Sequence, residues 1–269
     1  MPMPKLSIPE IKTRKQSGPK LTMLTAYDYP TGKLVDQAGI DLILVGDSLG
    51  MVCLGYPDTV PVTMDEMVHH TAAVARAAER ALVVGDLPFL SYQVSPEDAV
   101  RSAGRLFKEA RADCVKLEGG RTQADKVAAI VRAGIPVMGH IGLTPQTATQ
   151  LGGFKVQGKA PEAAQALLDD ARALEEAGAF AVVLECVPTS LGRRVTEALS
   201  IPTIGIGAGP HCDGQVLVLH DLVGLFDRFV PRFVKRYANL SDEIRAAVAR
   251  YRDEVQGGIF PGEEHQFGG

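Results

Sequence analysis

Short apolar runs of strand length recur along the chain, each bounded by glycine, proline or a residue that can cap a helix. Eight such runs predict strands, at residues 21–27, 42–45, 81–84, 114–117, 136–138, 181–184, 202–206 and 216–219. Most of these runs lack the alternation of apolar and polar residues that indicates one solvated face. They are therefore expected to be parallel strands that are covered on both faces.

Amphipathic stretches with helix signals fill most of the gaps between the predicted strands. Two of these stretches open on a capping sequence, one at Thr63 and one at Ser95. Gly39, Gly134 and Gly178 stand in three similar Ala-Gly phrases, each where a helix is expected to end and the next strand to begin. The repeated use of one connection indicates a regular succession of strands and helices.

This succession of strands and helices predicts an α/β fold, with a (β/α)8 TIM barrel favoured over an open doubly wound sheet. The chain has 269 residues, which suits one such barrel, and no stretch is rich enough in Pro, Gly or Ser to divide it. We predict a single barrel domain over residues 1–269, with an N-terminal helical extension over 1–20 and a C-terminal helix and tail over 239–269. Within the last part, residues 242–255 are expected to form a helix and 257–269 an extended tail that could exchange between subunits.

The composition narrows the class of protein. Hydrophobic residues make up 46% and charged residues 22% of the chain, which argues against disorder. A formal net charge of -4 gives no attraction for nucleic acid. Because the chain lacks a long apolar run and its first residues lack a signal-peptide core, we expect a cytoplasmic protein with no membrane partner. The four cysteines form no CxxC pair and are expected to be free thiols.

Ionisable residues stand at the ends of five consecutive predicted strands: Asp47, Asp86, Glu118, His140 and Glu185. In a parallel barrel these carboxyl ends converge on one face, which is where the active sites of barrel enzymes lie. Residues far apart in the sequence would therefore share one pocket.

The three acids nearest the N-terminus suggest a metal site. Each acid taken alone is more simply explained as a helix cap, but Asp47 and Asp86 stand well before the expected helix starts at Thr63 and Ser95. Adjacent carboxylates repel one another unless a cation joins them, and oxygen ligands favour Mg²⁺. We expect Asp47 and Asp86 to bind the ion directly and Glu118 to bind it directly or through water. Mn²⁺ or another divalent ion remains an alternative.

Two further residues of the middle strands are candidates for substrate contacts. Lys116 precedes Glu118 by two residues, so its side chain points to the same side of the strand. A buried ammonium there would need an anionic ligand, or else an internal ion pair with Glu118. His140 is interpreted as a substrate contact, a proton relay or a core histidine with satisfied hydrogen bonds.

Glu185 lies in an apolar run, a setting that makes a carboxylate more basic and suits a general base. The alternative is a structural ion pair with Arg193 or Arg194. The glycines of residues 204–209 lack the spacing of a dinucleotide fingerprint, so no cofactor is expected there.

Taken together, these residues resemble the ketopantoate hydroxymethyltransferase family. The matching phrases occur in the right order across nearly the whole chain, at residues 25–28, 45–51, 85–89, 115–120, 139–146, 184–188 and 204–209. The tail over 260–267 fits more loosely, with Gln266 where a small residue is expected.

The resemblance implies a (β/α)8 barrel that transfers a hydroxymethyl group from 5,10-methylenetetrahydrofolate to 3-methyl-2-oxobutanoate. The product would be 2-dehydropantoate, on the route to pantothenate and coenzyme A. It also implies a cytoplasmic homo-oligomer, a decamer in well-known members, with one Mg²⁺ per subunit. By position, the metal would be held by Asp47, Asp86 and Glu118, the oxo acid by Asp47, Ser48, Asp86 and Lys116, and the proton accepted by Glu185.

The chemistry of the oxo acid agrees with these roles. A 2-oxo acid can chelate Mg²⁺, which would stabilise the enolate formed when C3 loses its proton to Glu185. The nearest rival is a Mg²⁺-dependent lyase or mutase of the phosphoenolpyruvate mutase and isocitrate lyase group, but its Lys-Lys-Cys-Gly-His-type loop is absent. A second rival is a non-catalytic protein that binds metal and oxo acid, in which an acid placed like Glu185 would have no purpose.

Overall fold

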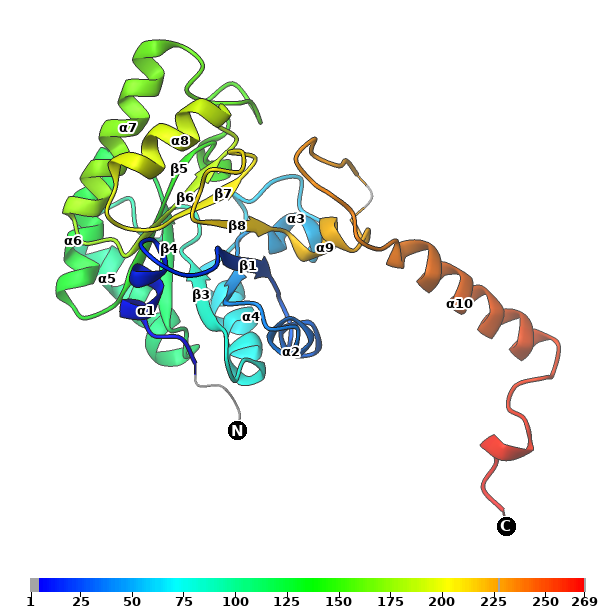
Figure 1. Cartoon of the computed structure of the whole chain (residues 1–269). Helices are drawn as coiled ribbons and strands as arrows, with labels where there is room; N and C mark the ends of the chain where they lie inside the picture. The colour runs from blue at the N-terminus through cyan, green and yellow to red at the C-terminus, as the bar shows by residue number, and fades with distance from the viewer. Residues whose placement is uncertain (1–4, 227, 269) are drawn as a thin grey trace. The chain divides into compact units, whose positions relative to one another are not determined.

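Eight parallel strands close into a barrel in the computed structural model of the chain (Figure 1). The structure describes residues 5–226 and 228–268. Each strand pairs with the next in chain order, and β8 pairs with β1. The strands are β1 (Leu21–Thr25), β2 (Leu42–Val45), β3 (Leu82–Asp86), β4 (Cys114–Glu118), β5 (Val137–Gly142), β6 (Ala181–Glu185), β7 (Thr203–Ile206) and β8 (Gly214–Leu217). The predicted (β/α)8 fold is confirmed.

Helices connect the strands and surround them (Figure 1). The α-helices are α1 (Ile8–Arg14), α2 (Tyr29–Gln37), α3 (Leu49–Val52), α4 (Met64–Ala77), α5 (Pro96–Gly104), α6 (Ala124–Arg132), α7 (Pro161–Glu176), α8 (Thr189–Ala198), α9 (Leu219–Leu222) and α10 (Leu240–Gln256). Shorter helical turns are η1 (Arg105–Glu109), η2 (Arg121–Gln123), η3 (Pro145–Thr147) and η4 (Glu263–His265).

The capping signals act as the sequence predicts. The side chains of Thr63 and Ser95 each accept a hydrogen bond from a backbone N–H of the first turn of α4 and α5. Gly39, Gly134 and Gly178 adopt φ angles of 81°, 91° and 99° after α2, α6 and α7. These left-handed conformations end the helices and turn the chain into the next strand.

The strand ends differ from the prediction in an informative way. Strands β3, β4 and β6 run on to include Asp86, Glu118 and Glu185, and β5 continues past His140 to Gly142. The apolar run ends earlier because these residues are polar, whereas the ladder of backbone hydrogen bonds continues through them. The acids are thus held by the sheet itself rather than by the loops after it.

Six other predicted strand boundaries were wrong. Strands β3, β5 and β7 each begin one residue later than predicted. Strand β1 ends at Thr25, two residues earlier than predicted, and β8 begins at Gly214 and ends at Leu217. The short helix α3, directly after β2, was not predicted. The tail is not wholly extended, because the turn η4 interrupts it.

The amino-terminal half of the barrel is filled by apolar side chains. The buried cluster includes the first residues of several strands, among them Leu21, Leu42, Leu82 and Cys114. Ile11 of α1 is fully buried in the same cluster, so the N-terminal helix packs against the amino ends of the strands. Because this half is apolar and packed, the polar side chains of the barrel lie at its other end.

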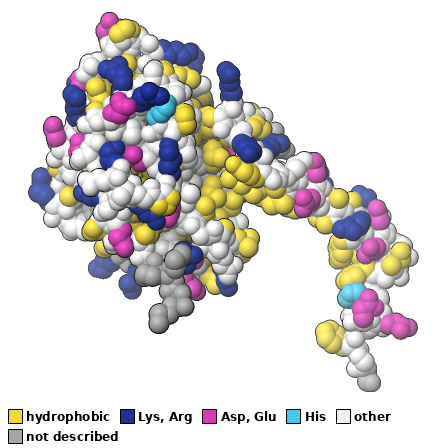
Figure 2. Space-filling model, viewed as in Figure 1, with side chains coloured by type: hydrophobic (Ala, Val, Ile, Leu, Met, Phe, Trp, Pro, Cys, Tyr) yellow, Lys and Arg dark blue, Asp and Glu magenta, His cyan; other side chains and the backbone are white. Residues whose placement is uncertain are grey.

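The chain divides into two compact units, Met1–Val218 and Leu219–Gly269. The first contains the barrel, and the second contains α9, α10 and η4. Helix α10 confirms the predicted C-terminal helix, and Ile244, Val248 and Tyr251 on it are exposed. Apolar and charged side chains are interspersed along this second unit (Figure 2). The prediction of one domain over residues 1–269 remains a prediction.

No helix within residues 5–226 and 228–268 combines the length and the apolarity needed to cross a membrane.

Candidate active site

The register of the barrel places the polar residues of neighbouring strands beside one another. Asp86 of β3 is paired with Lys116 of β4, and Glu118 of β4 is paired with His140 of β5. Glu185 of β6 is opposite Gly142, two residues beyond His140. We refer to the buried polar group that results as the strand-end cluster: Asp47, Asp86, Lys116, Glu118, His140 and Glu185.

Lys116 is the central cation of this cluster. Its Nζ atom lies 2.8 Å from Asp86 Oδ1 and 4.0 Å from Glu118 Oε1, and its side chain is only 4% exposed. Burial alone would lower the pKa of Lys116, but the charges of Asp86, Glu118 and Asp47 outweigh burial and raise it. The predicted ion pair with Glu118 is present but longer than the contact with Asp86, so the ammonium is shared between the acids.

Asp47 and Asp86 are destabilised as carboxylates. Burial, the charge of Asp86 and the charge of Glu118 together raise the pKa of Asp47 well above its usual range. Burial also raises the pKa of Asp86, although Lys116 acts in the opposite direction. The backbone N–H of Asp47 donates to Asp86 Oδ2 at 3.3 Å, which brings the two residues together. A further cation beside them would favour the charged form of both.

Glu118 differs from the two aspartates in the direction of its pKa shift, and both of its carboxylate oxygens have partners. Oε1 lies 3.3 Å from His140 Nδ1, and Oε2 accepts a 3.0 Å hydrogen bond from the backbone N–H of Gln146. Burial would raise the pKa of Glu118, but the hydrogen bond and charge of His140 and the charge of Lys116 lower it below its ordinary value. Glu118 is therefore the stable anion of the group.

His140 bridges two acids. Its Nδ1 atom faces Glu118, and its Nε2 atom lies 3.2 Å from Glu185 Oε2. Burial and the nearby Lys116 lower its pKa, but the contacts with Glu118 and Glu185 prevail and raise it to about 9. The three interpretations of His140 as substrate contact, proton relay or core histidine stay predictions.

Glu185 is the most accessible acid of the cluster, with a side chain that is 16% exposed. Its partner among the described residues is His140, whereas the guanidinium of Arg193 lies 2.7 Å from His211 Nε2. The alternative of a structural ion pair with Arg193 or Arg194 is therefore not what the described ion pairs show.

Ser48 follows Asp47 and begins α3 without using its side chain as a helix cap. Its hydroxyl lies 2.8 Å from the hydroxyl of the buried Tyr27, at the end of β1. The Asp47 side chain reaches away from α3, because its Oδ2 accepts a 2.9 Å hydrogen bond from Gln146 Nε2, beyond the end of β5.

Sequence reasoning missed two residues that contact the cluster, Gln146 and Tyr92. Gln146 follows β5 and is buried, and its side-chain Oε1 lies 2.8 Å from the Tyr92 hydroxyl. Tyr92 lies in the loop after β3 and Gln146 in the short turn η3 after β5, and Gln146 ends one of the family-like phrases. That position was the available signal, but burial of a loop glutamine is not visible in a sequence.

The donor set fits a divalent cation at Asp47 and Asp86. Within the part of the chain that the structure describes, no three His, Cys, Asp or Glu side chains are arranged so that together they could hold a metal ion. However, the buried Asp86 Oδ1 has an ion-pair partner in Lys116 but no hydrogen bond of good geometry. The carboxylate oxygens of Asp47 and Asp86, whose negative charge is disfavoured by burial, are ligands that suit Mg²⁺. Because His140 and Lys116 already stabilise the charge of Glu118, contact through water fits Glu118 better than direct contact.

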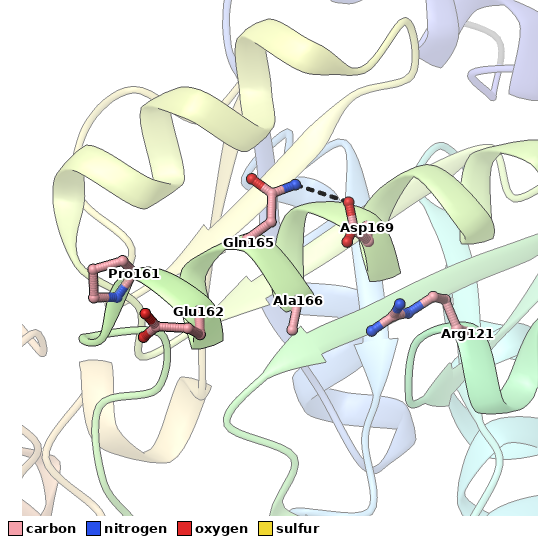
Figure 3. A pocket seen from close by; sticks show the side chains of 6 residues that line it. All are labelled: Arg121, Pro161, Glu162, Gln165, Ala166 and Asp169. Carbon is pink, nitrogen blue, oxygen red and sulfur yellow. Dashed lines mark hydrogen bonds between the residues drawn. The ribbon is translucent and has the colours of Figure 1, made fainter.

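A shallow surface hollow of about 460 Å³ lies elsewhere on the barrel unit, beside α7 and η2. Figure 3 shows its lining, which contains no residue of the strand-end cluster: Arg121, Pro161, Glu162, Gln165, Ala166 and Asp169. Gln165 donates to Asp169 within the lining, and Arg121 pairs with the neighbouring Asp170. Because it contains no residue of the strand-end cluster, the hollow is a weaker candidate than the cluster.

Comparison with known proteins identifies close relatives. A family model described as ketopantoate hydroxymethyltransferase matches residues 5–263. A 3-methyl-2-oxobutanoate hydroxymethyltransferase from Moorella thermoacetica is 64% identical over 263 residues, covering 98% of each chain. Enzymes of the same name from Heliobacterium modesticaldum and Enterococcus faecalis are 62% and 61% identical, covering 98% and 95% of this chain and 96% and 93% of their own.

Solved structures with a similar fold are more distant in sequence. A phosphonopyruvate hydrolase has a TM-score of 0.62 at 16% identity, with 99% of this chain and 92% of that chain covered. A 2,3-dimethylmalate lyase of the PEP mutase/isocitrate lyase superfamily has a TM-score of 0.58 at 14% identity, with coverage of 97% and 91%. At such low identity these structures support the barrel fold alone.

Proposed function

The chain belongs to the ketopantoate hydroxymethyltransferase family, and on that premise we propose that it transfers a hydroxymethyl group from 5,10-methylenetetrahydrofolate to 3-methyl-2-oxobutanoate. Membership makes it a hydroxymethyl-transferring enzyme. The proposed product is 2-dehydropantoate, an intermediate of pantothenate biosynthesis. The proposed partners are small molecules, with no nucleic acid or membrane.

One observation carries the proposal: polar residues from the ends of β2 to β6 meet in a single buried cluster. The contacts run from Asp86 through Lys116 and Glu118 to His140 and Glu185, at distances between 2.8 and 4.0 Å. The cluster combines anionic oxygens for a cation, an ammonium for an organic acid and an accessible carboxylate as a base.

The proposed binding of the oxo acid depends on charge. Asp47 and Asp86 would hold Mg²⁺, which, when bound, supplies Lewis-acid stabilisation for the enolate of the 2-oxo acid. Lys116 would attract the carboxylate of the oxo acid from its buried position, and the Ser48 hydroxyl would donate a hydrogen bond to it. These contacts would hold the substrate in one orientation.

Glu185 is the proposed proton acceptor. Its carboxylate would take the proton from C3 of the oxo acid, and the electron pair of that C–H bond would move into the enolate. His140, which bridges Glu185 and Glu118, would keep the Glu185 carboxylate oriented. C3 would then form a bond to the one-carbon unit of the folate. Both C–N bonds of the methylene bridge break, and one water supplies the product hydroxyl. The proton taken from C3 and the remaining proton of that water complete the two N–H bonds of tetrahydrofolate, which leaves.

The decisive experiment is product analysis. The purified protein, incubated with both substrates and Mg²⁺, is expected to form 2-dehydropantoate, detected by mass spectrometry. Addition of excess EDTA should remove the activity, and excess Mg²⁺ should restore it. Absence of the product at saturating substrates and metal would overturn the proposal.

We also propose a homo-oligomer, with the decamer of well-known family members as the expected size. The exposed apolar side chains of α10 support this proposal, because they are the kind of surface that subunits cover. Light scattering coupled to size-exclusion chromatography should give a mass several times the 28.7 kDa of one chain.

A further inference from the structure

Gln146 makes more contacts to the strand-end cluster than a connecting loop requires. Its side-chain Nε2 donates to Asp47 Oδ2, and its backbone N–H donates to Glu118 Oε2. We propose that Gln146, held in place by Tyr92, is a positioning residue that fixes the orientation of Asp47 and Glu118 for a divalent cation. This inference rests on the proposed metal-dependent function and extends it to a residue outside the predicted ligand set.

The orientation of the Gln146 amide follows from its four neighbours. The Tyr92 hydroxyl and the Gln93 amide nitrogen, which can both donate, lie 2.8 and 3.4 Å from Oε1. Two acceptors, Asp47 Oδ2 and the carbonyl oxygen of Leu87, each lie 2.9 Å from Nε2. Turning the amide over would place its oxygen against two acceptors, so only the present orientation lets Nε2 donate to both of them. The single proton of the Tyr92 hydroxyl lies within reach of both Oε1 and the carbonyl oxygen of Glu118.

Tyr92 holds the other side of this arrangement. Its hydroxyl accepts a 3.1 Å hydrogen bond from the backbone N–H of Glu118 and lies 2.9 Å from the carbonyl oxygen of the same residue. The Tyr92 ring is almost fully buried. A rigid aromatic side chain therefore fixes the end of β4 and the Gln146 amide together.

As a consequence, the carboxylates of Asp47, which follows β2, and Glu118, in β4, are held in one orientation relative to each other. The hydrogen bond from Gln146 Nε2 to Asp47 Oδ2 restricts rotation of the Asp47 carboxylate. The hydrogen bond from the Gln146 backbone N–H to Glu118 Oε2 restricts rotation of the Glu118 carboxylate. Orienting partners of this kind commonly change metal affinity by about 10- to 100-fold when they are removed. The same donors also stabilise the charged form of acids that burial disfavours.

The test uses Gln146→Met, which keeps the length of the side chain and the backbone N–H but removes the amide. Calorimetric titration with Mg²⁺ should show a Kd about 10- to 100-fold higher than that of the wild-type protein. The Mg²⁺ concentration for half-maximal activity should rise by the same factor, while kcat at saturating Mg²⁺ falls by less than about threefold. The exposed Gln150→Met, in the same loop, is the matched control and should leave both quantities unchanged.

Tyr92→Phe is a second variant that keeps the buried ring and removes only the hydroxyl, should Gln146→Met fail to fold. It should raise the Kd for Mg²⁺ at least threefold without loss of the far-ultraviolet circular dichroism. Unchanged Kd values in the folded variants would overturn the positioning role. That result is separate from the fate of the proposed function, because metal affinity is measured without substrates. A wild-type protein that binds Mg²⁺ but forms no 2-dehydropantoate would overturn the function alone.

Discussion

His140 lies between two carboxylates of the strand-end cluster that we expect to have different roles. One ring nitrogen faces Glu118, which is buried and has partners on both oxygens, and the other faces Glu185, which is partly exposed. An acid that must bind a substrate proton needs access to the substrate, so Glu185 is the better base. Glu118 instead balances the charges of Lys116 and His140.

This difference predicts the effect of Glu185→Gln. An amide cannot accept a proton, so exchange of the C3 proton of 3-methyl-2-oxobutanoate in heavy water should fall by about 10²- to 10⁴-fold. The exchange is followed by NMR, with Mg²⁺ present and folate absent. The exposed Glu197→Gln, on α8, is the matched control. Unchanged exchange in Glu185→Gln would remove Glu185 from the mechanism.

The metal ligands can be ranked by the same reasoning. Asp47→Ala and Asp86→Ala should weaken Mg²⁺ binding far more than Glu118→Ala, because burial disfavours the charged form of the two aspartates, whereas His140 and Lys116 already stabilise the charge of Glu118. Calorimetric titration of the three variants measures the difference. Equal losses of affinity would contradict the assignment of the two aspartates as direct ligands.

At the scale of elements, the close contact between the carboxyl ends of β5 and β6 positions Glu185. Gly142 has a φ angle of +95°, and a Cβ atom there would lie 2.2 Å from the carbonyl oxygen of Glu185. The same oxygen accepts a 2.8 Å hydrogen bond from the backbone N–H of Leu143. Close approach of the two backbones is therefore possible only because residue 142 has no side chain.

Gly142→Ala should consequently damage both stability and catalysis. The left-handed conformation alone costs alanine about 1–2 kcal/mol, and the contact with the Glu185 backbone adds to that cost. Gly153→Ala is the matched control, because Gly153 has a φ of +98° with open space around it. Urea unfolding should show a larger loss for Gly142→Ala, and only this variant should lose C3-proton exchange, by about tenfold or more. Equal effects of the two substitutions would show that the close approach does not position Glu185.

At the scale of the whole molecule, the barrel encloses an excess of acidic groups. Among residues 5–226 and 228–268, the cationic groups that face Asp47, Asp86, Glu118 and Glu185 are Lys116 and His140, whose pKa is raised to about 9. Burial and the charges of neighbouring acids raise the pKa values of Asp47 and Asp86. A divalent cation would balance the excess.

Mg²⁺ should therefore stabilise the folded protein. A ligand that binds only the native state adds about 2.7 kcal/mol at a concentration of 100 times its Kd. The midpoint of thermal unfolding, measured by calorimetry, should rise by several degrees with Mg²⁺ and return to its starting value with EDTA. Asp47→Ala should abolish the shift. An equal shift in that variant would place the stabilising ion elsewhere.

The barrel and the positions of its acids could be predicted from the sequence because the signals are local. Parallel strands covered on both faces need continuous apolar runs, and helix caps depend on residues only three or four positions apart. The order of strands then fixed that Asp47, Asp86, Glu118, His140 and Glu185 share one end of the barrel. The family-like phrases added the expected reaction.

Tertiary structure alone decided which of these residues touch. The pairing of His140 with Glu185, the closer contact of Lys116 with Asp86 than with Glu118, and the contact of Gln146 with Asp47 all join different parts of the chain. Such contacts depend on strand register, on the path of the loops and on packing against buried side chains. A sequence determines what each strand presents at its end, but only the closed barrel sets the distances between those ends, because every strand is held by two neighbours at once.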